Sequence, residues 1–258
     1  MLTTPWVMKP RVSNGASLRL FCFPYAGGGA IIYHGWPPRL PMIELLSVQL
    51  PGRETRLKEA PYTSLPALVR ATGQALLPFF DKPFCFFGHS MGALIAFELA
   101  REIRREYGLS PRHIFVSGRR APTIPLQHKT IHDLPQKEFI ERLRDLNGTR
   151  PAVLEFTELI ELLLPMLKAD FAICETYVYK HDEPLNCGIS AFGGLEDGHV
   201  KREHLEAWRQ QTVREFKLRM LPGDHFFLHS SQEVLLEIMF RELHKQLGSN
   251  GRTDASST

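Results

Sequence analysis

The chain has 258 residues, a length that fits one large domain. Its hydrophobic fraction of 43% is ordinary for a globular protein, and a net charge of +3 is too small to indicate a nucleic-acid partner. No run approaches about 18 apolar residues and the N-terminus lacks the layout of a signal peptide, so we expect a soluble, cytoplasmic protein without a membrane partner.

The cysteines are scattered along the chain and form no C-x-x-C pair, a spacing that favours free thiols over disulfides or a zinc site. They are Cys22, Cys85, Cys174 and Cys187. The histidines do not share metal-ligand spacing with cysteines or carboxylates. We therefore expect neither a metal nor a cofactor.

The first predicted strand covers residues 18–23 and ends at Pro24, where the chain enters Tyr-Ala-Gly-Gly-Gly at residues 25–29. These glycines do not form a dinucleotide fingerprint, because no glycine occupies the sixth position and no P-loop lysine follows. Two interpretations remain open. The segment is either a flexible turn or a loop that supplies a backbone N–H to an oxyanion hole, as the loop after an early strand does in α/β-hydrolases.

A nucleophile elbow is predicted at Gly-His-Ser-Met-Gly, residues 88–92. An apolar strand at 84–87 runs directly into this segment, and a helical pattern follows it as far as Gly108. This arrangement places Ser90 at the apex of the turn and directs His89 away from it, and side chains in place of the two glycines would crowd the elements that they join. The G-x-S-x-G pattern alone occurs by chance in roughly one chain in ten of this length, so its setting carries the prediction.

Strand and helix patterns alternate along most of the chain, which predicts a mostly parallel central sheet flanked by helices, the α/β-hydrolase architecture. The other predicted strands cover residues 45–50, 114–117, 189–192 and 217–221, and the other helices follow Ser64, Pro135 and Ser230-Ser231. The last helix opens with a capping-box pattern and is expected to direct Val234, Leu235, Ile238 and Met239 inward. Residues 1–247 are thus predicted to form one domain, and 248–258 a disordered tail.

Apolar residues crowd more than one side of a predicted helix within residues 153–167. A helix that is apolar on several sides is buried from several sides. Either this helix lies in the core, or it belongs to a helical cap whose second apolar face lines a channel.

Two later turns provide a base and an acid for Ser90. A serine hydroxyl is a weak nucleophile that needs a base, and the base needs an acid to orient it. In α/β-hydrolases the acid follows a later strand and the histidine follows the last strand. In this chain these positions hold Asp197 and His225. Because sites form at the carboxyl ends of parallel strands, we predict a Ser90–His225–Asp197 triad, with Glu196 as the close competitor for the acid and Asp224 as a weaker one.

Several longer motifs occur in a fixed order along nearly the whole chain. They are Phe23-Pro24-Tyr25-Ala26-Gly27-Gly28-Gly29, Trp36, Leu50-Pro51-Gly52-Arg53-Glu54-Thr55-Arg56, Gly88-His89-Ser90-Met91-Gly92, Leu167-Lys168-Ala169-Asp170 and Pro222-Gly223-Asp224-His225-Phe226-Phe227. Together they resemble type II thioesterases, the stand-alone α/β-hydrolases that accompany polyketide synthases and nonribosomal peptide synthetases. This family is related to the medium-chain thioesterase that acts with animal fatty acid synthase.

The resemblance implies a role for each site residue. Ser90 would be the nucleophile, His225 the general base and then acid, and Asp197 the residue that orients it. The N–H groups of Met91 and Ala26 would form the oxyanion hole. The implied reaction is hydrolysis of an acyl thioester on the phosphopantetheine arm of a carrier protein, through an acyl-serine intermediate. In this family that reaction removes wrongly loaded groups and reprimes the synthase.

The resemblance also implies a helical lid at about residues 130–185 that covers an acyl channel. The partners would be acyl or peptidyl carrier protein domains, and we expect a monomer. Five arginines invite two interpretations, either part of a dock for an acidic carrier protein or simply a solvated surface. They are Arg101, Arg104, Arg105, Arg119 and Arg120.

Other functions also fit the motifs. One is the chain-terminating release of medium-chain fatty acids, and another is hydrolysis of oxygen esters with a similar triad. A third is a binding module without catalysis, which would shield or shuttle acyl carriers.

Overall fold

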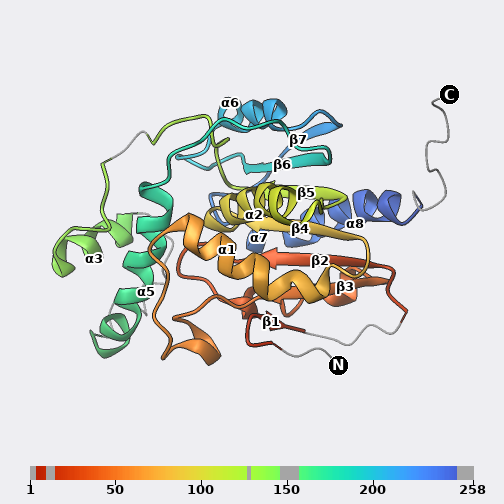
Figure 1. The fold of residues 1–258 in the computed structure, drawn as a ribbon. Helices are drawn as coiled ribbons and strands as arrows, with labels where there is room; N and C mark the ends of the chain where they lie inside the picture. The colour runs from red at the N-terminus through yellow and green to blue at the C-terminus, as the bar shows by residue number, and fades with distance from the viewer. Residues whose placement is uncertain (1–3, 10–14, 127–128, 146–156, 249–258) are drawn as a thin grey trace.

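A computed structural model describes residues 4–9, 15–126, 129–145 and 157–248. Its centre is a seven-stranded sheet with the strand order β1-β3-β2-β4-β5-β6-β7 (Figure 1). Every neighbouring pair is parallel except β1 with β3. The strands are β1 (Val7–Met8), β2 (Leu18–Phe23), β3 (Ile43–Val48), β4 (Phe84–His89), β5 (His113–Ser117), β6 (Gly188–Gly194) and β7 (Phe216–Leu221). The predicted α/β-hydrolase architecture is confirmed.

The central strands are apolar on both faces because helices cover both sides of the sheet. All six residues of β2 and of β4 are buried, and most of them are apolar; Arg19 on β2 and His89 at the end of β4 are buried polar residues. The predicted strands match the observed ones closely, except that β3 begins and ends two residues before the predicted range of 45–50. The difference arises because the hydrophobic pattern predicts which residues are buried, not which ones pair as a strand. Leu50 is buried although β3 ends at Val48.

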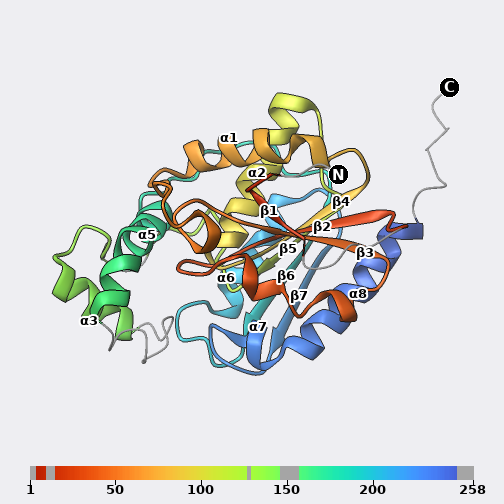
Figure 2. The same ribbon diagram turned by 90° about the horizontal axis from the view of Figure 1, so that it is seen from below.

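Two layers of helices enclose the sheet, and each has its own hydrophobic cluster. One face carries α1 (Leu65–Leu76), α2 (Met91–Tyr107) and α6 (Arg202–Glu206), and the other carries α7 (Phe227–Ser230) and α8 (Gln232–Gly248) (Figure 2). Short 3₁₀ turns complete the layers: η1 (Ala30–Tyr33), η2 (Pro37–Arg39), η3 (Glu54–Arg56), η4 (Leu77–Phe79) and η5 (Ala207–Gln211). The sheet is therefore shielded from water on both faces.

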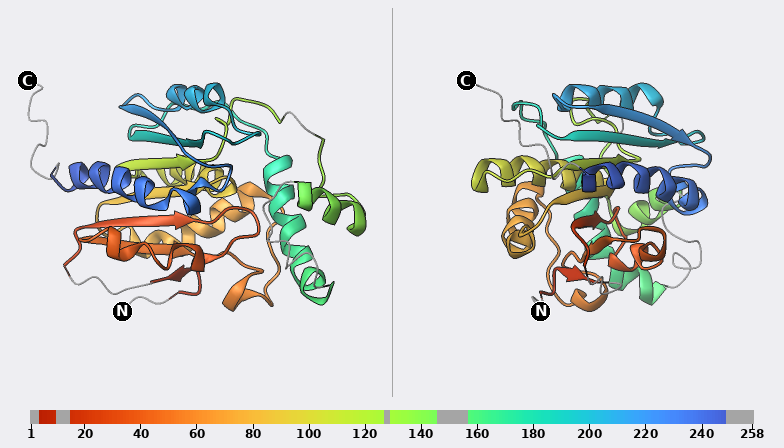
Figure 3. Two further views of the ribbon diagram at one scale, coloured as in Figure 1. Left: turned by 180° about the vertical axis from the view of Figure 1, so that it is seen from behind. Right: turned by 90° about the vertical axis from the view of Figure 1, so that its right-hand side faces the viewer.

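A third hydrophobic cluster lies away from both faces of the sheet. It joins α3 (Gln136–Asp145) to α5 (Thr157–Glu175), with Phe139, Leu143 and Leu167 among its buried members. These helices stand at one end of the sheet, and α8 extends toward the other end (Figure 3). Of the two interpretations for the apolar helix, a position outside the main core fits better. The lid at about 130–185 stays a prediction, because its residues 146–156 lie outside the described residues, as does the tail beyond Gly248.

Three local predictions differ from the structure. Ser64 occupies the cap position of α1, but its side chain makes no capping bond. The hydroxyl of Ser231 donates to the carbonyl of Pro222 at 2.7 Å, so this serine ties α7 and α8 to the end of β7. Val234 is 47% exposed, whereas Leu235 and Met239 are fully buried, because the buried face of α8 includes Leu236 in place of Val234.

No helix in the described parts of the chain is long and apolar enough to cross a lipid bilayer. The four cysteines are free, as expected: three are buried, and Cys174 is half-buried. Burial raises the pKa of Cys187 to about 12, which keeps its thiol protonated and unreactive at neutral pH.

His113, at the start of β5, is a buried histidine that is kept neutral. Its Nε2 lies 2.8 Å from the hydroxyl of Ser190 on β6, and its ring fills the space where Gly188 has no side chain. Burial lowers the pKa of His113 to about 4, although the nearby Glu242 acts in the opposite direction. His113 therefore takes up a proton more readily in the unfolded chain than in the native protein.

We predict that this histidine makes the protein less stable in mild acid. The free energy of unfolding should fall as pH drops from about 6.5, the ordinary value, toward 4, and a shift of this size corresponds to about 3 kcal/mol. His113→Gln, which can keep the bond to Ser190, should lose this component in urea unfolding at a series of pH values. The exposed His181 serves as the matched control, because His181→Gln should keep the wild-type slope. Equal slopes for the two variants would contradict the prediction.

Candidate active site

Ser90 lies at the sharp turn between β4 and α2, the position predicted for the nucleophile. Its backbone has φ 52° and ψ −113°, a conformation that a residue with a side chain adopts rarely and at a cost of about 1–3 kcal/mol. Its N–H donates to the carbonyl of Ser117 on β5 at 2.7 Å, and its carbonyl accepts from Ala93 on α2 at 3.1 Å. The two neighbouring elements therefore hold the strained residue in place.

The two glycines of the elbow permit a very close backbone approach. A Cβ atom on Gly88 would lie 2.1 Å from the carbonyl oxygen of Gly92, and one on Gly92 would lie 2.1 Å from the carbonyl oxygen of Phe23. Neither neighbour is a flexible side chain that could move aside. The predicted crowding is confirmed, and the second contact also joins α2 to the end of β2.

His225 and Asp197 meet although they are 28 residues apart. Nδ1 of His225 lies 2.7 Å from Oδ2 of Asp197, whose side chain is fully buried. The turns after β6 and β7 are joined by backbone bonds, from Leu195 to Leu221 at 2.8 Å and from Glu196 to Gly223 at 3.0 Å. These bonds fix the distance between the carboxylate and the ring.

The Asp197 carboxylate is held in its ionised form. Burial by itself would raise its pKa, but the hydrogen bond and charge of His225 lower it. Oδ1 also accepts the N–H groups of His199 at 2.8 Å and Val200 at 3.0 Å, which lower it further. The net result is that the pKa of Asp197 lies below its ordinary value. The carboxylate therefore stays ionised across the neutral range and can accept a hydrogen bond from the N–H of His225 Nδ1.

The competing residues take other positions. Glu196 and Asp224 are exposed, and Oδ1 of Asp224 accepts the N–H of Phe226 at 2.8 Å. His89 is fully buried, with Nδ1 2.9 Å from the hydroxyl of Ser117. Burial and the nearby His225 lower the pKa of His89 well below its ordinary value. His89 is thus a neutral support beneath the elbow.

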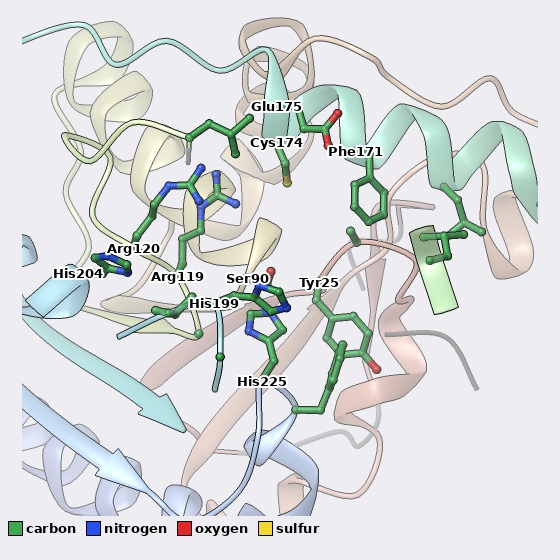
Figure 4. Close-up of a pocket in the computed structure, with 18 residues that line it drawn as sticks. Tyr25, Ser90, Arg119, Arg120, Phe171, Cys174, Glu175, His199, His204 and His225 are labelled. Carbon is green, nitrogen blue, oxygen red and sulfur yellow. The ribbon is translucent and has the colours of Figure 1, made fainter. Parts of the chain in front are cut away.

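Ser90 and His225 line one cavity of about 320 Å³ (Figure 4). Tyr25, Ala26 and Phe226 line it on the side of the sheet. Helix α5 supplies the opposite wall with Leu167, Phe171, Cys174 and Glu175, and Arg119 and Arg120 project from a third side. The elbow, the histidine and the α5 helix therefore enclose a common space. Within the described residues, no group of three or more metal-binding side chains is arranged around an ion site.

Of the two residues predicted to form the oxyanion hole, Met91 directly follows Ser90 in the chain, and Ala26 lines the same cavity as Ser90. Met91 is the first residue of α2, so its N–H has no partner within the helix. Ala26 lines the cavity in a turn that is closed by the bond from Gly28 N to the Tyr25 carbonyl at 2.9 Å. Donors of this kind suit the negative oxygen of a tetrahedral intermediate.

The glycine-rich segment at 25–29 is held by a buried ion pair. The N–H of Gly27 donates to Oδ2 of Asp170 on α5 at 2.8 Å. Both oxygens of Asp170 accept from Arg53, at 2.7 and 2.9 Å, and Arg53 also donates to the carbonyl of Gly28 at 2.9 Å. The side chains of Arg53 and Asp170 are only 5% and 1% exposed. Of the two interpretations of this segment, a free flexible turn does not fit this arrangement.

Sequence reasoning did not predict this clamp of Arg53, Asp170 and Gly27. All three residues stand in motifs that carried the family resemblance, but nothing local indicates that they meet. The only hint in the sequence was that all three residues belong to motifs of the family resemblance. A buried carboxylate in a helix needs a partner, and Arg53 is the charge that reaches it.

The five arginines named in the sequence do not form one surface. Arg101 is buried and pairs with Glu98 and Asp182. Arg104 also pairs with Asp182, and Arg105 pairs with Glu102. Three of them lie on α2 in ion pairs, and the other two line the cavity, so the buried Arg101 does not belong to a solvated surface. A dock for an acidic carrier protein stays a prediction.

Comparison with known proteins gives consistent matches along the chain. A family model described as "Thioesterase domain" matches residues 18–247. "Gramicidin S biosynthesis protein GrsT" of Aneurinibacillus migulanus is 50% identical over 239 residues, 92% of this chain and 93% of that protein. "Linear gramicidin dehydrogenase LgrE" of Brevibacillus parabrevis is 50% identical over 246 residues, 94% of each chain. The solved structure of "the type II thioesterase BorB from the borrelidin biosynthetic cluster" has a TM-score of 0.86 at 34% identity and covers 94% of this chain and 99% of that chain.

We predict that Asp170→Ala lowers the free energy of unfolding by about 3–5 kcal/mol, because it leaves the Arg53 guanidinium buried without a counter-ion. Urea unfolding should show that the double variant Arg53→Met/Asp170→Leu loses less than the sum of the losses from Arg53→Met and Asp170→Leu made singly. Arg105→Gln is the control, since Arg105 is an exposed partner whose surface pair with Glu102 contributes about 0–1 kcal/mol. Additive losses at positions 53 and 170 would argue against a coupled pair.

Proposed function

Since the chain belongs to the thioesterase family and is a thioester hydrolase, we propose that Ser90, His225 and Asp197 are its catalytic triad. The resemblance to type II thioesterases drawn from the sequence motifs is confirmed. One observation carries the proposal: His225 is held by Asp197 at 2.7 Å and lines the same cavity as Ser90. With Nδ1 bonded to the carboxylate, Nε2 is the nitrogen that remains for the serine.

The proposed reaction has two halves. Ser90 Oγ attacks the thioester carbonyl carbon while His225 Nε2 takes the hydroxyl proton, and the N–H groups of Met91 and Ala26 stabilise the oxyanion. The C–S bond then breaks, and the leaving thiolate receives the proton from His225. In the second half, His225 activates a water molecule that attacks the acyl-Ser90 ester, which releases a carboxylic acid and restores the serine.

Asp197 contributes by fixing the ring and by stabilising the imidazolium that forms in each half. Its lowered pKa supports this role, because a carboxylate that stays ionised can balance the transient positive charge. The strained backbone conformation of Ser90 also supports the proposal, because it presents the hydroxyl outward from a strand-to-helix turn.

We further propose that the substrate is an acyl group on the phosphopantetheine arm of a carrier protein, and that the enzyme edits or reprimes a nonribosomal peptide or polyketide synthase. The names of the relatives support this role: GrsT is named for gramicidin S biosynthesis, and BorB is a type II thioesterase of the borrelidin cluster. LgrE is named a dehydrogenase, but the glycines at residues 25–29 of this chain lack the spacing of a dinucleotide-binding motif. In this proposal α3 and α5 act as the lid over the acyl cavity.

Ser90→Ala should reduce thioester hydrolysis by at least about 10³-fold without lowering the folded stability, because the alanine removes only the nucleophile. The measurement is thiol release from an acyl carrier protein, with thermal unfolding as the check on the fold. A fluorophosphonate should label the wild-type protein and fail to label the variant. Full turnover by Ser90→Ala would defeat the triad, and an unlabelled, inactive wild-type protein would favour the binding-module alternative.

Editing and chain release differ in their preferred acyl group. An editing enzyme should tolerate short acyl chains, so its kcat/KM for acetyl carrier thioesters should lie within about tenfold of that for medium chains. A tenfold difference corresponds to about 1.4 kcal/mol of binding free energy. Acetyl-, octanoyl- and benzoyl-loaded carriers are the substrates to compare. A preference for octanoyl above about 10³-fold would instead support the release of medium-chain fatty acids.

A further inference from the structure

Arg119 and Arg120 follow directly after β5, and the backbone around them is fixed. Gly118 donates to the carbonyl of Phe192 at 2.9 Å. The carbonyl of Arg119 accepts from the indole of Trp208 at 2.8 Å, and Ala121 donates to the carbonyl of His204 at 3.0 Å. The two side chains are therefore presented by a rigid segment.

Both side chains line the cavity that contains Ser90 and His225 (Figure 4). They also line a second cavity of about 250 Å³, together with Pro122, Tyr177 and Tyr179. The two arginines thus stand where the two spaces meet. A substrate that extends from Ser90 in this direction has to pass them.

Neither guanidinium forms an ion pair in the described parts of the chain. Nε of Arg120 donates to the carbonyl of Ile124 at 3.2 Å, and Arg119 lines both cavities together with Cys174. The carbonyl and the thiol are both uncharged. The pair is therefore two neighbouring cations on one wall of a partly buried cavity.

The carboxylate of Glu175, which lines the same cavity, is already engaged by another segment. It accepts the backbone N–H groups of Ile131 at 2.9 Å and His132 at 3.0 Å, and it contacts the ring Nδ1 of His132 at 2.7 Å. Burial and the neighbouring Arg119 lower the pKa of Arg120 to about 10. This is the direction expected for a cation that lacks a counter-ion.

We propose that Arg119 and Arg120 form an anion-binding subsite of the catalytic cavity, occupied by an anionic oxygen group of the thioester substrate. Guanidinium groups bind carboxylates and phosphates through paired, charge-assisted hydrogen bonds. The anion has two chemical sources, a carboxylate on the acyl group or the phosphate on the carrier arm. The inference rests on the proposed function, because it takes Ser90 as the point from which the substrate extends.

Four small thioesters separate the two sources: hexanoyl and 5-carboxypentanoyl groups, each on pantetheine and on 4′-phosphopantetheine. Arg119→Gln and Arg120→Gln should lower kcat/KM by about 10–100-fold for the substrates that carry the recognised anion, the loss typical of a charge-assisted hydrogen bond. Neutral hexanoyl-pantetheine should change by less than about threefold. Arg241→Gln, which makes the same charge change on the exposed face of α8, should affect all four equally little.

Each outcome decides the proposal. A loss confined to the carboxylated acyl groups assigns the subsite to the acyl chain, and one confined to the phosphorylated arms assigns it to the carrier arm. Equal losses on all four thioesters, or no loss on any, would overturn the subsite. Arg120→Lys should restore part of the selectivity by keeping the charge, and thermal unfolding of each variant checks the loop that Ile124 anchors. Failure of the triad would appear separately, as undiminished hydrolysis of hexanoyl-pantetheine by Ser90→Ala.

Discussion

The left-handed backbone at Ser90 is the constraint on which the site depends. A strand, a turn and a helix can follow one another within so few residues only if Gly88 and Gly92 let backbone atoms approach where a Cβ would collide. The bond from Ser90 to Ser117 ties the turn to β5, and Gly92 packs on the end of β2. The order of the sheet, with β4 between β2 and β5, is thus what supports the strain at one residue.

The clamp of Arg53, Asp170 and Gly27 links the active-site loop to α5 in one buried contact. A buried ion pair is seldom a net gain in stability over apolar residues of similar size. Its value lies in geometry, because a bidentate pair with a third donor allows one arrangement of the three segments. The position of α5 and the conformation of the loop that carries Ala26 are thereby set together.

The cavity has two kinds of wall. Leu167 and Phe171 on α5 offer apolar surface, which suits an acyl chain, whereas Arg119 and Arg120 offer positive charge. Between them lie Ser90 and His225, where the chemistry of a thioester would take place. A substrate with an apolar part and an anionic part would match both walls, and a purely hydrocarbon substrate would match only one.

The sequence by itself determined the alternation of strands and helices, the elbow, and the order of serine, acid and histidine. These features depend on periodicity, on glycine in tight turns and on strand ends, all of which act over a few residues. Whether Asp197 or Glu196 contacts His225 depended on how the turns after β6 and β7 pair, and the burial of Arg101 depended on Asp182. The meeting of Arg53 with Asp170 joins residues that are 117 positions apart. Such pairs depend on how the whole chain is packed, so no local pattern indicates them and only the tertiary structure decided them.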